Sequence, residues 1–419
     1  MDLATRRLLA VLLGCVAVLT LSGYLLKAQC IGHYDTRRDS NLCSNDIQVL
    51  YKARGMQDHP FPYINGGLVH TEHGARLVGG ALEYPVLTGL FAWLPALAVH
   101  DDGGYLQLTA LLLTPFSFLT VWLLARMVRW RALLYALAPP LVWYSFHNWD
   151  LLVVCATVGA CYAWWRERYA WAGVWLAVGA SLKFWPLFFL LPLLLDRLAG
   201  GDRPSAARAL AAFTAAFAGV NGPFLLTSPR GWWAPYAFQA ERAPDITSNG
   251  IWYWGFPTLS TDDLNTLVPV LLALGTLAAC AVGWWRAKAE GVYPFVQVCA
   301  AVLAVFMLTN KAHSPQYVLW LLPFFCLLRL RWGWWAAYMV FDTLMYVGVF
   351  RWYYALSLGH DFGLAKQALV LGVWGRAVML VLLYVVFLRS DPAFERRRQP
   401  ELAPSEQPTG SNRTSLSFG

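Results

Sequence analysis

The sequence has few charged residues. Asp, Glu, Lys and Arg together make up 13% of its 419 residues, about half of the fraction that soluble domains usually carry. The mean hydropathy is +0.46, and apolar runs recur from residue 8 to residue 388 without a polar block long enough to fold alone. The shortage of charge therefore argues against a soluble protein and predicts an all-α polytopic membrane protein with one integral domain, residues 1–388.

The basic residues do not form one continuous patch, although the formal net charge is +8. They occur in short clusters between apolar runs, namely RMVRWR, RER, RAKAE, RLR and ERRR. Such clusters are typical of cytoplasmic loops in membrane proteins. The excess of positive charge therefore indicates orientation in the membrane, and we expect no nucleic-acid partner.

The positions of these clusters predict a topology of about twelve transmembrane helices. The first apolar run, 8–26, follows Arg6 and Arg7 and is predicted to be a retained helix with a cytoplasmic N-terminus. Residues 27–104 then form a large first extracytoplasmic loop that carries short amphipathic helices and, at 84–99, a re-entrant or surface-lying segment. The other helices are predicted near 105–126, 131–146, 149–165, 168–182, 184–197, 207–226, 266–285, 292–309, 316–329, 334–350 and 365–388.

Two further segments complete the organisation. Residues 227–265 form a second large external loop, rich in Trp and Tyr, and residues 389–419 are predicted to be a disordered cytoplasmic tail. Six of the eight cysteines lie in apolar runs, whereas Cys30 and Cys43 lie in the first loop. These two either form a disulfide or stay free, and the sequence does not decide between the two states.

Ionisable and amide side chains gather at the predicted outer ends of the helices. Burying such groups at membrane depth costs several kcal/mol, so they mark functional sites. They come from the first loop and from the stretches HNWD, SLKFWP, NKAHSPQY and FRWYY, and they are Asp46, Arg54, Glu83, Tyr84, Asn148, Asp150, Lys183, Lys311, His313, Gln316 and Arg351. Their distribution predicts an active site on the extracytoplasmic face.

The types of these side chains suggest a reaction. Lys183 and Lys311, with Arg351 or Arg242, suit the phosphate headgroup of a lipid. Asp46 suits a general base that deprotonates an acceptor hydroxyl. Together they predict glycosyl transfer from a lipid phosphate.

Simpler interpretations exist for the same residues. Asp46 and Asp150 suit helix caps, and the two lysines suit anchors at the membrane interface. His70 and His73, with His59 or Glu72, form only a weak metal pattern. A lipid-linked sugar flippase or a non-catalytic scaffold also needs buried polar groups, but a transporter would carry them at mid-membrane.

The stretches NDIQVLY, EYPVLTGL, NWDLL, GASLKFWPLFFLLPLLL and NKAHSPQYVLWLLPF occur in this order along some two thirds of the chain. As a set they resemble glycosyltransferase family 87, integral GT-C enzymes of actinobacteria related to polyprenyl-phosphate-mannose-dependent mannosyltransferases. The resemblance implies a GT-C fold, a catalytic Asp46 and a His313 near the donor phosphate, with Lys183 and Lys311 matching a phosphate site more loosely. Asp35, Asp39 and Glu83 stay as rivals for the base.

The resemblance also implies substrates and location. The expected donor is a polyprenyl-phosphate sugar, with mannose favoured and arabinose as the alternative, and the expected acceptor is a cell-envelope glycolipid or glycan among the membrane lipids. We expect a plasma-membrane protein with both termini cytoplasmic. No cofactor is expected to be obligate and no metal site is assigned, while a divalent cation stays open.

Overall fold

The computed structural model describes residues 3–58, 61–71, 74–361 and 363–395, and this part of the chain is mostly helical. Five of its helical segments are long and apolar enough to cross a membrane. They are α1 (Leu3–Ala28), α5 (Asp102–Val128) continued by η1 (Arg129–Ala132) and α6 (Leu133–Ala136), α11 (Arg203–Thr227), α14 (Thr261–Glu290) and α18 (Leu364–Arg389). The chain is therefore a helical multi-pass membrane protein, as predicted, whereas the number of twelve spans stays a prediction.

Several apolar helices are shorter than the roughly 20 residues of a straight span. They are α4 (Val86–Ala96), α8 (Asp150–Trp165), α9 (Tyr169–Leu182), α15 (Phe295–Thr309) and α16 (Val318–Leu327). Helix α8 is buried along nearly its whole length and packs against α5 and α9, and α9 packs in turn against α11. These helices thus meet protein on most sides, which makes their short length tolerable.

Three predicted helices are interrupted. The predicted helix 131–146 is divided into η1, α6 and α7 (Pro140–Tyr144), with Pro139 and Pro140 at the break. The predicted helices 184–197 and 316–329 each begin with a 3-10 turn, η2 (Trp185–Phe189) before α10 (Leu190–Ala199) and η3 (Pro315–Tyr317) before α16. Proline lacks the backbone N–H that an α-helix interior requires, so it fits the first turn of a helical segment, where Pro140, Pro186 and Pro315 lie.

The first predicted loop contains more than short helices. Besides α2 (Tyr34–Arg37) and α3 (Asp46–Ala53), it forms an antiparallel hairpin of β1 (Gly67–Thr71) and β2 (Gly74–Val78), with Gly67 opposite Val78. The hairpin packs against α12 (Pro229–Glu241), and α13 (Ile251–Gly255) follows α12 in the second predicted loop. Cys30 and Cys43 are joined by a disulfide, with their Cα atoms 6.4 Å apart.

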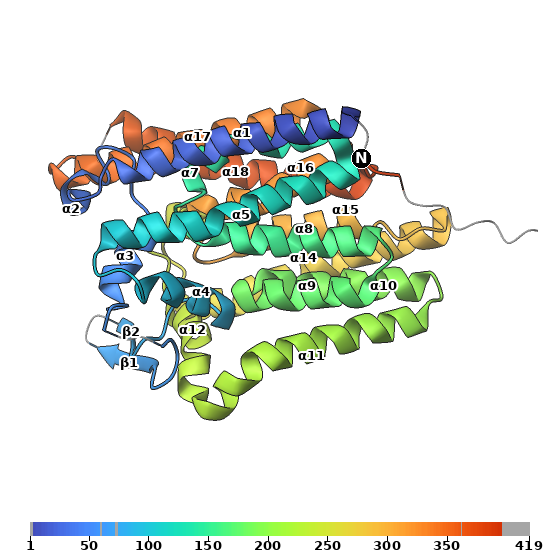
Figure 1. The fold of residues 1–419 in the computed structure, drawn as a ribbon, viewed down its shortest axis with the longest axis horizontal. Helices are drawn as coiled ribbons and strands as arrows, with labels where there is room; N and C mark the ends of the chain where they lie inside the picture. Colours follow the sequence, from blue (N-terminus) through green and yellow to red (C-terminus); the bar gives the residue numbers. More distant parts are fainter. Residues whose placement is uncertain (1–2, 59–60, 72–73, 362, 396–419) are drawn as a thin grey trace, which may run out of the picture.

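The two ends of the helix bundle carry different elements (Figure 1). The N-terminus lies at one end, where the Trp165 indole donates to the carbonyl of Glu395 and the Arg286 guanidinium to that of Leu388. The Arg131 guanidinium donates there to three carbonyls between Phe325 and Leu328. At the opposite end lie α2, α3, the hairpin, α4 and α12, and α17 (Trp332–Ser357) packs along α18 between the two ends. The predicted disordered tail is outside the described residues from 396 onward.

Candidate active site

Asp46 is the first residue of α3, but it does not cap this helix. The cap is Asn45, whose side chain accepts a hydrogen bond of 2.9 Å from the Gln48 backbone N–H. The Asp46 carboxylate instead accepts a 2.7 Å hydrogen bond from the amide of Asn148, and its backbone N–H donates to the carbonyl of His147 at 2.7 Å. The NWD turn therefore fixes Asp46 and leaves its carboxylate available for chemistry.

Lys183 directly follows α9 and is held by groups from two other segments. Its ammonium lies 3.3 Å from Asp150 Oδ1 and 4.4 Å from the centre of the Tyr84 ring. Asp150 is fully buried and also accepts a 2.7 Å hydrogen bond from the Trp320 indole. The Tyr84 hydroxyl in turn accepts a hydrogen bond of 2.6 Å from Asn148, so the supports of Asp46 and Lys183 share one network.

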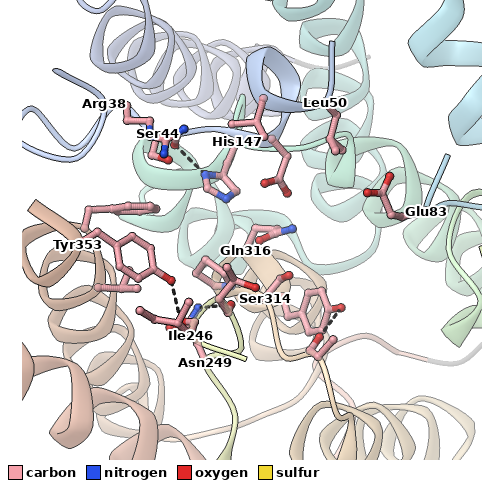
Figure 2. Close-up of a pocket in the computed structure, with 18 of the residues that line it drawn as sticks. Arg38, Ser44, Leu50, Glu83, His147, Ile246, Asn249, Ser314, Gln316 and Tyr353 are labelled. Atoms are coloured by element: carbon pink, nitrogen blue, oxygen red, sulfur yellow. Dashed lines mark hydrogen bonds between the residues drawn. The ribbon is translucent and has the colours of Figure 1, made fainter. Parts of the chain in front are cut away.

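A cavity of ≈ 590 Å³ opens over this network. Figure 2 shows Arg38 and Tyr353 on one side of it and Glu83 on the other, with His147 and Gln316 between them. Five residues proposed from the sequence line it: Asp46, Glu83, Tyr84, Lys183 and Gln316. The cavity therefore brings together the predicted carboxylate base and one of the two predicted lysines.

Two more predicted residues act from behind the cavity wall, and a third acts at its rim. Asn148 and Asp150 are fully buried and hold Asp46 and Lys183, as described above. Arg54 forms an ion pair with Glu83, whose carboxylate it holds at the rim. These three residues orient side chains that line the cavity.

Three predicted residues lie elsewhere. The Lys311 ammonium donates to the carbonyl of Ala240 at 2.8 Å and to Asn265 at 2.6 Å. His313 donates from Nδ1 to the Met307 carbonyl at 2.7 Å, and its Nε2 contacts Arg376. Arg351 is exposed on α17. None of the three lines the cavity that holds Asp46.

The rival carboxylates are placed differently from Asp46. Asp39 lines the cavity beside Arg38, at 3.5 Å from its guanidinium. Asp35 is exposed, pairs with Lys52 at 3.2 Å and does not line the cavity. Burial raises the pKa of the Asp46 carboxyl, and the Asn148 hydrogen bond and the charges of Lys183, Arg242 and Lys27 oppose this rise. A carboxyl with a raised pKa is a better proton acceptor than an ordinary one.

The cavity is also lined by polar residues that were not predicted from the sequence, among them Arg38, His147 and Asn249, and by Arg242, which was predicted only as an alternative cation. His147 precedes the NWD stretch, and its position next to two proposed residues is the one signal that could have identified it. Arg38, Arg242 and Asn249 lie in loops or at helix ends without a recognisable pattern. Only the folded chain brings them together.

No group of three or more His, Cys, Asp or Glu side chains in the described part of the chain is arranged to hold a metal ion. His70, one member of the metal pattern, lies 2.7 Å from Glu241 on α12. His59, Glu72 and His73 are outside the described residues.

Comparison with known proteins identifies the family of the chain. The comparison with curated proteins found no match. A family model described as glycosyltransferase family 87 matches residues 82–309, a region that includes Glu83, Tyr84, the NWD turn and Lys183. Because this match covers more than half of the 419 residues, the chain belongs to glycosyltransferase family 87.

Proposed function

We propose that this glycosyltransferase moves a mannosyl residue from a polyprenyl monophosphate to a cell-envelope glycolipid or glycan, at the outer face of the plasma membrane. The observation that carries the proposal is the shared cavity of Asp46 and Lys183. A partly buried carboxylate and an ammonium fixed by Asp150 are the two groups that such a transfer needs. The choice of mannose rests on the resemblance of the sequence motifs.

The reaction follows from the chemistry of these two side chains. Asp46 removes the proton of an acceptor hydroxyl as its oxygen attacks the anomeric carbon of the donor sugar. The bond between that carbon and the phosphate oxygen breaks, and the polyprenyl phosphate leaves with the bonding electrons. Lys183 stabilises the negative charge that develops on this phosphate. The proton on Asp46 then passes to water, which restores the base.

The charges around the cavity support a phosphate donor. Arg38, Lys183 and Arg242 all line the cavity, and cations suit a phosphate group more than a neutral sugar. Elements that line the cavity, α3 and α12 among them, lie at the end of the bundle opposite to Arg131 and Arg286, which belong to two of the basic clusters. By the positive-inside tendency, this favours an extracytoplasmic site and cytoplasmic termini.

The proposal is tested by replacing Asp46 with Asn. The purified protein in liposomes is supplied with radiolabelled mannosyl phosphopolyprenol and a membrane lipid extract, and labelled glycolipid product is measured. We expect Asp46→Asn to lower kcat by about 10²- to 10⁴-fold, because the amide cannot accept the proton.

The matched control is Asp35→Asn, which removes an exposed carboxylate outside the cavity and should leave turnover unchanged. Normal turnover of Asp46→Asn would show that another group is the base. A wild-type protein that moves the labelled lipid across the bilayer but forms no new glycosidic bond would instead be a flippase.

A further inference from the structure

His147 lines the cavity, and its ring orientation is fixed by a hydrogen bond. Its Nδ1 lies 3.0 Å from the carbonyl oxygen of Ser44, as the dashed line in Figure 2 marks. A carbonyl oxygen has no proton to donate, so Nδ1 must carry the proton of this bond. In the neutral ring, Nε2 then has a free lone pair.

Nε2 lies on the side of the ring away from Ser44, and it has no hydrogen-bond partner within the described residues. The side chain is only 4% exposed, so the cavity is the place from which a partner can reach this nitrogen. Burial lowers the pKa of His147 well below its usual value, and the charges of Lys27 and Lys183 lower it further. The ring is therefore neutral near pH 7, and Nε2 is a hydrogen-bond acceptor.

Because Nε2 of His147 is a hydrogen-bond acceptor, it favours a ligand group that can donate a hydrogen bond. Phosphate oxygens are themselves acceptors and carry negative charge, so they gain nothing from a neutral Nε2. A hydroxyl, in contrast, donates a hydrogen bond to the Nε2 lone pair. Lys183 and Arg242 line the same cavity and donate hydrogen bonds to oxygen, so the cavity offers both donors and, at His147, an acceptor.

His147 and Asp46 are also joined by a backbone hydrogen bond. The Asp46 backbone N–H donates to the His147 carbonyl at 2.7 Å, and Ser44, which accepts from the His147 ring, lies two residues before Asp46. Sugars carry hydroxyls on adjacent carbons, so one hydroxyl at Asp46 places a second one within reach of a neighbouring side chain.

We propose that His147 determines acceptor specificity: its Nε2 accepts a hydrogen bond from a hydroxyl of the acceptor sugar that neighbours the hydroxyl deprotonated by Asp46. This inference rests on the proposed glycosyl transfer. It assigns to the acceptor a pair of neighbouring hydroxyls.

The first experiment compares two substitutions that separate the two ring nitrogens. His147→Asn keeps an N–H for Ser44 but removes the acceptor at the Nε2 position, whereas His147→Gln places a carbonyl oxygen near that position. In the liposome assay we expect His147→Asn to raise the apparent KM for the acceptor extract about tenfold, with the donor KM unchanged. His147→Gln should recover most of this loss, and His360→Asn, which changes an exposed histidine, should have no effect.

The inference is wrong if His147→Asn leaves the acceptor KM unchanged. A fall in kcat without a change in either KM would mean that His147 only holds the segment carrying Asp46. An inactive wild-type protein would overturn the proposed function and not the geometry.

A second measurement therefore needs no turnover. The ¹⁵N NMR signal of His147 Nε2 is followed while octyl α-mannoside or octyl phosphate is added to the detergent-solubilised protein. We expect the signal to shift with the mannoside and to stay constant with the phosphate. A shift with octyl phosphate alone would contradict the inference.

Discussion

The charge of Lys183 acts on two groups in the cavity: the carboxyl of Asp46 and the phosphate that leaves the donor. Its ammonium is held 3.3 Å from Asp150, and its charge lowers the pKa of Asp46 against the rise that burial causes. We therefore predict that Lys183→Gln lowers kcat by about 100-fold, because the leaving phosphate loses a fixed cation.

The pH profile of the same variant gives an independent readout. Asp46 must be ionised to act, so kcat/KM rises with pH through its pKa. Without Lys183 this pKa rises further, and we predict that the acid limb of the profile moves to higher pH. Lys52→Gln removes an exposed lysine as the control and should leave the limb in place. An unmoved limb in Lys183→Gln would mean that Asp46 does not sense this charge.

At the same scale, the sequence predicted residue types better than residue orientations. Asp46 and Lys183 share a cavity, while Lys311 contacts Asn265 and His313 contacts Arg376. All four occupy polar stretches between apolar runs, which is why the sequence grouped them. Which way a side chain points depends on partners such as Arg376, 63 positions away along the chain, and no local pattern contains that information.

At the scale of elements, the segment 42–46 is fixed from several sides. The Lys27 ammonium donates to the Ser44 carbonyl at 2.9 Å and to the Tyr346 hydroxyl at 3.0 Å, and Tyr346 donates to the Leu42 carbonyl. The disulfide of Cys43 ties this segment to the end of α1. Asp46 therefore enters the cavity on a segment that is held before any substrate binds.

This arrangement predicts the effect of removing the disulfide. Replacing Cys30 and Cys43 by Ser should lower the unfolding temperature, because a cross-link of this loop length stabilises a protein by roughly 3 kcal/mol. It should also lower kcat about tenfold, because a general base that is less well positioned is less effective. Thermal unfolding and the liposome assay measure the two effects. Cys15→Ser, at a free cysteine of α1, is the control. An equal fall in unfolding temperature and kcat in this control would mean that the effect does not come from the disulfide.

The sequence predicted the long helices better than it predicted interrupted helices and short strands. The long helices were predicted because their apolar runs exceed the length of a span. Helix α18 was placed within one residue at each end, whereas α14 extends five residues beyond its predicted range at each end. The helices interrupted near Pro139 and Pro315 were drawn too long, because the apolar runs continue through the breaks. The hairpin was missed, since its strands have five residues each; they pair with one another and pack against α12.

At the scale of the whole molecule, α14 offers a test of orientation. Its 30 residues are about 45 Å long, enough to cross a bilayer. The helix begins at the end of the bundle that holds the cavity and ends near Leu388, at the end of the basic clusters. Thr258, just before α14, and Ala289, at its last turn, are both exposed.

We predict that Thr258→Cys reacts with a membrane-impermeant maleimide on intact cells and that Ala289→Cys reacts only after the cells are opened. Labelling of the protein without either substitution corrects for the six free cysteines, five of which are buried. The reverse labelling pattern would place the cavity in the cytoplasm and would exclude an extracytoplasmic donor.

The bond between Cys30 and Cys43 has a consequence for the timing of activity. Thiols stay reduced in the cytoplasm, so in the proposed orientation this pair is oxidised only once the first loop has been exported. A newly made chain would then lack the cross-link that positions Asp46 while its first loop is still inside the cell, and its turnover would be lower than that of the exported chain. Export would thus be a step that raises the activity of the enzyme.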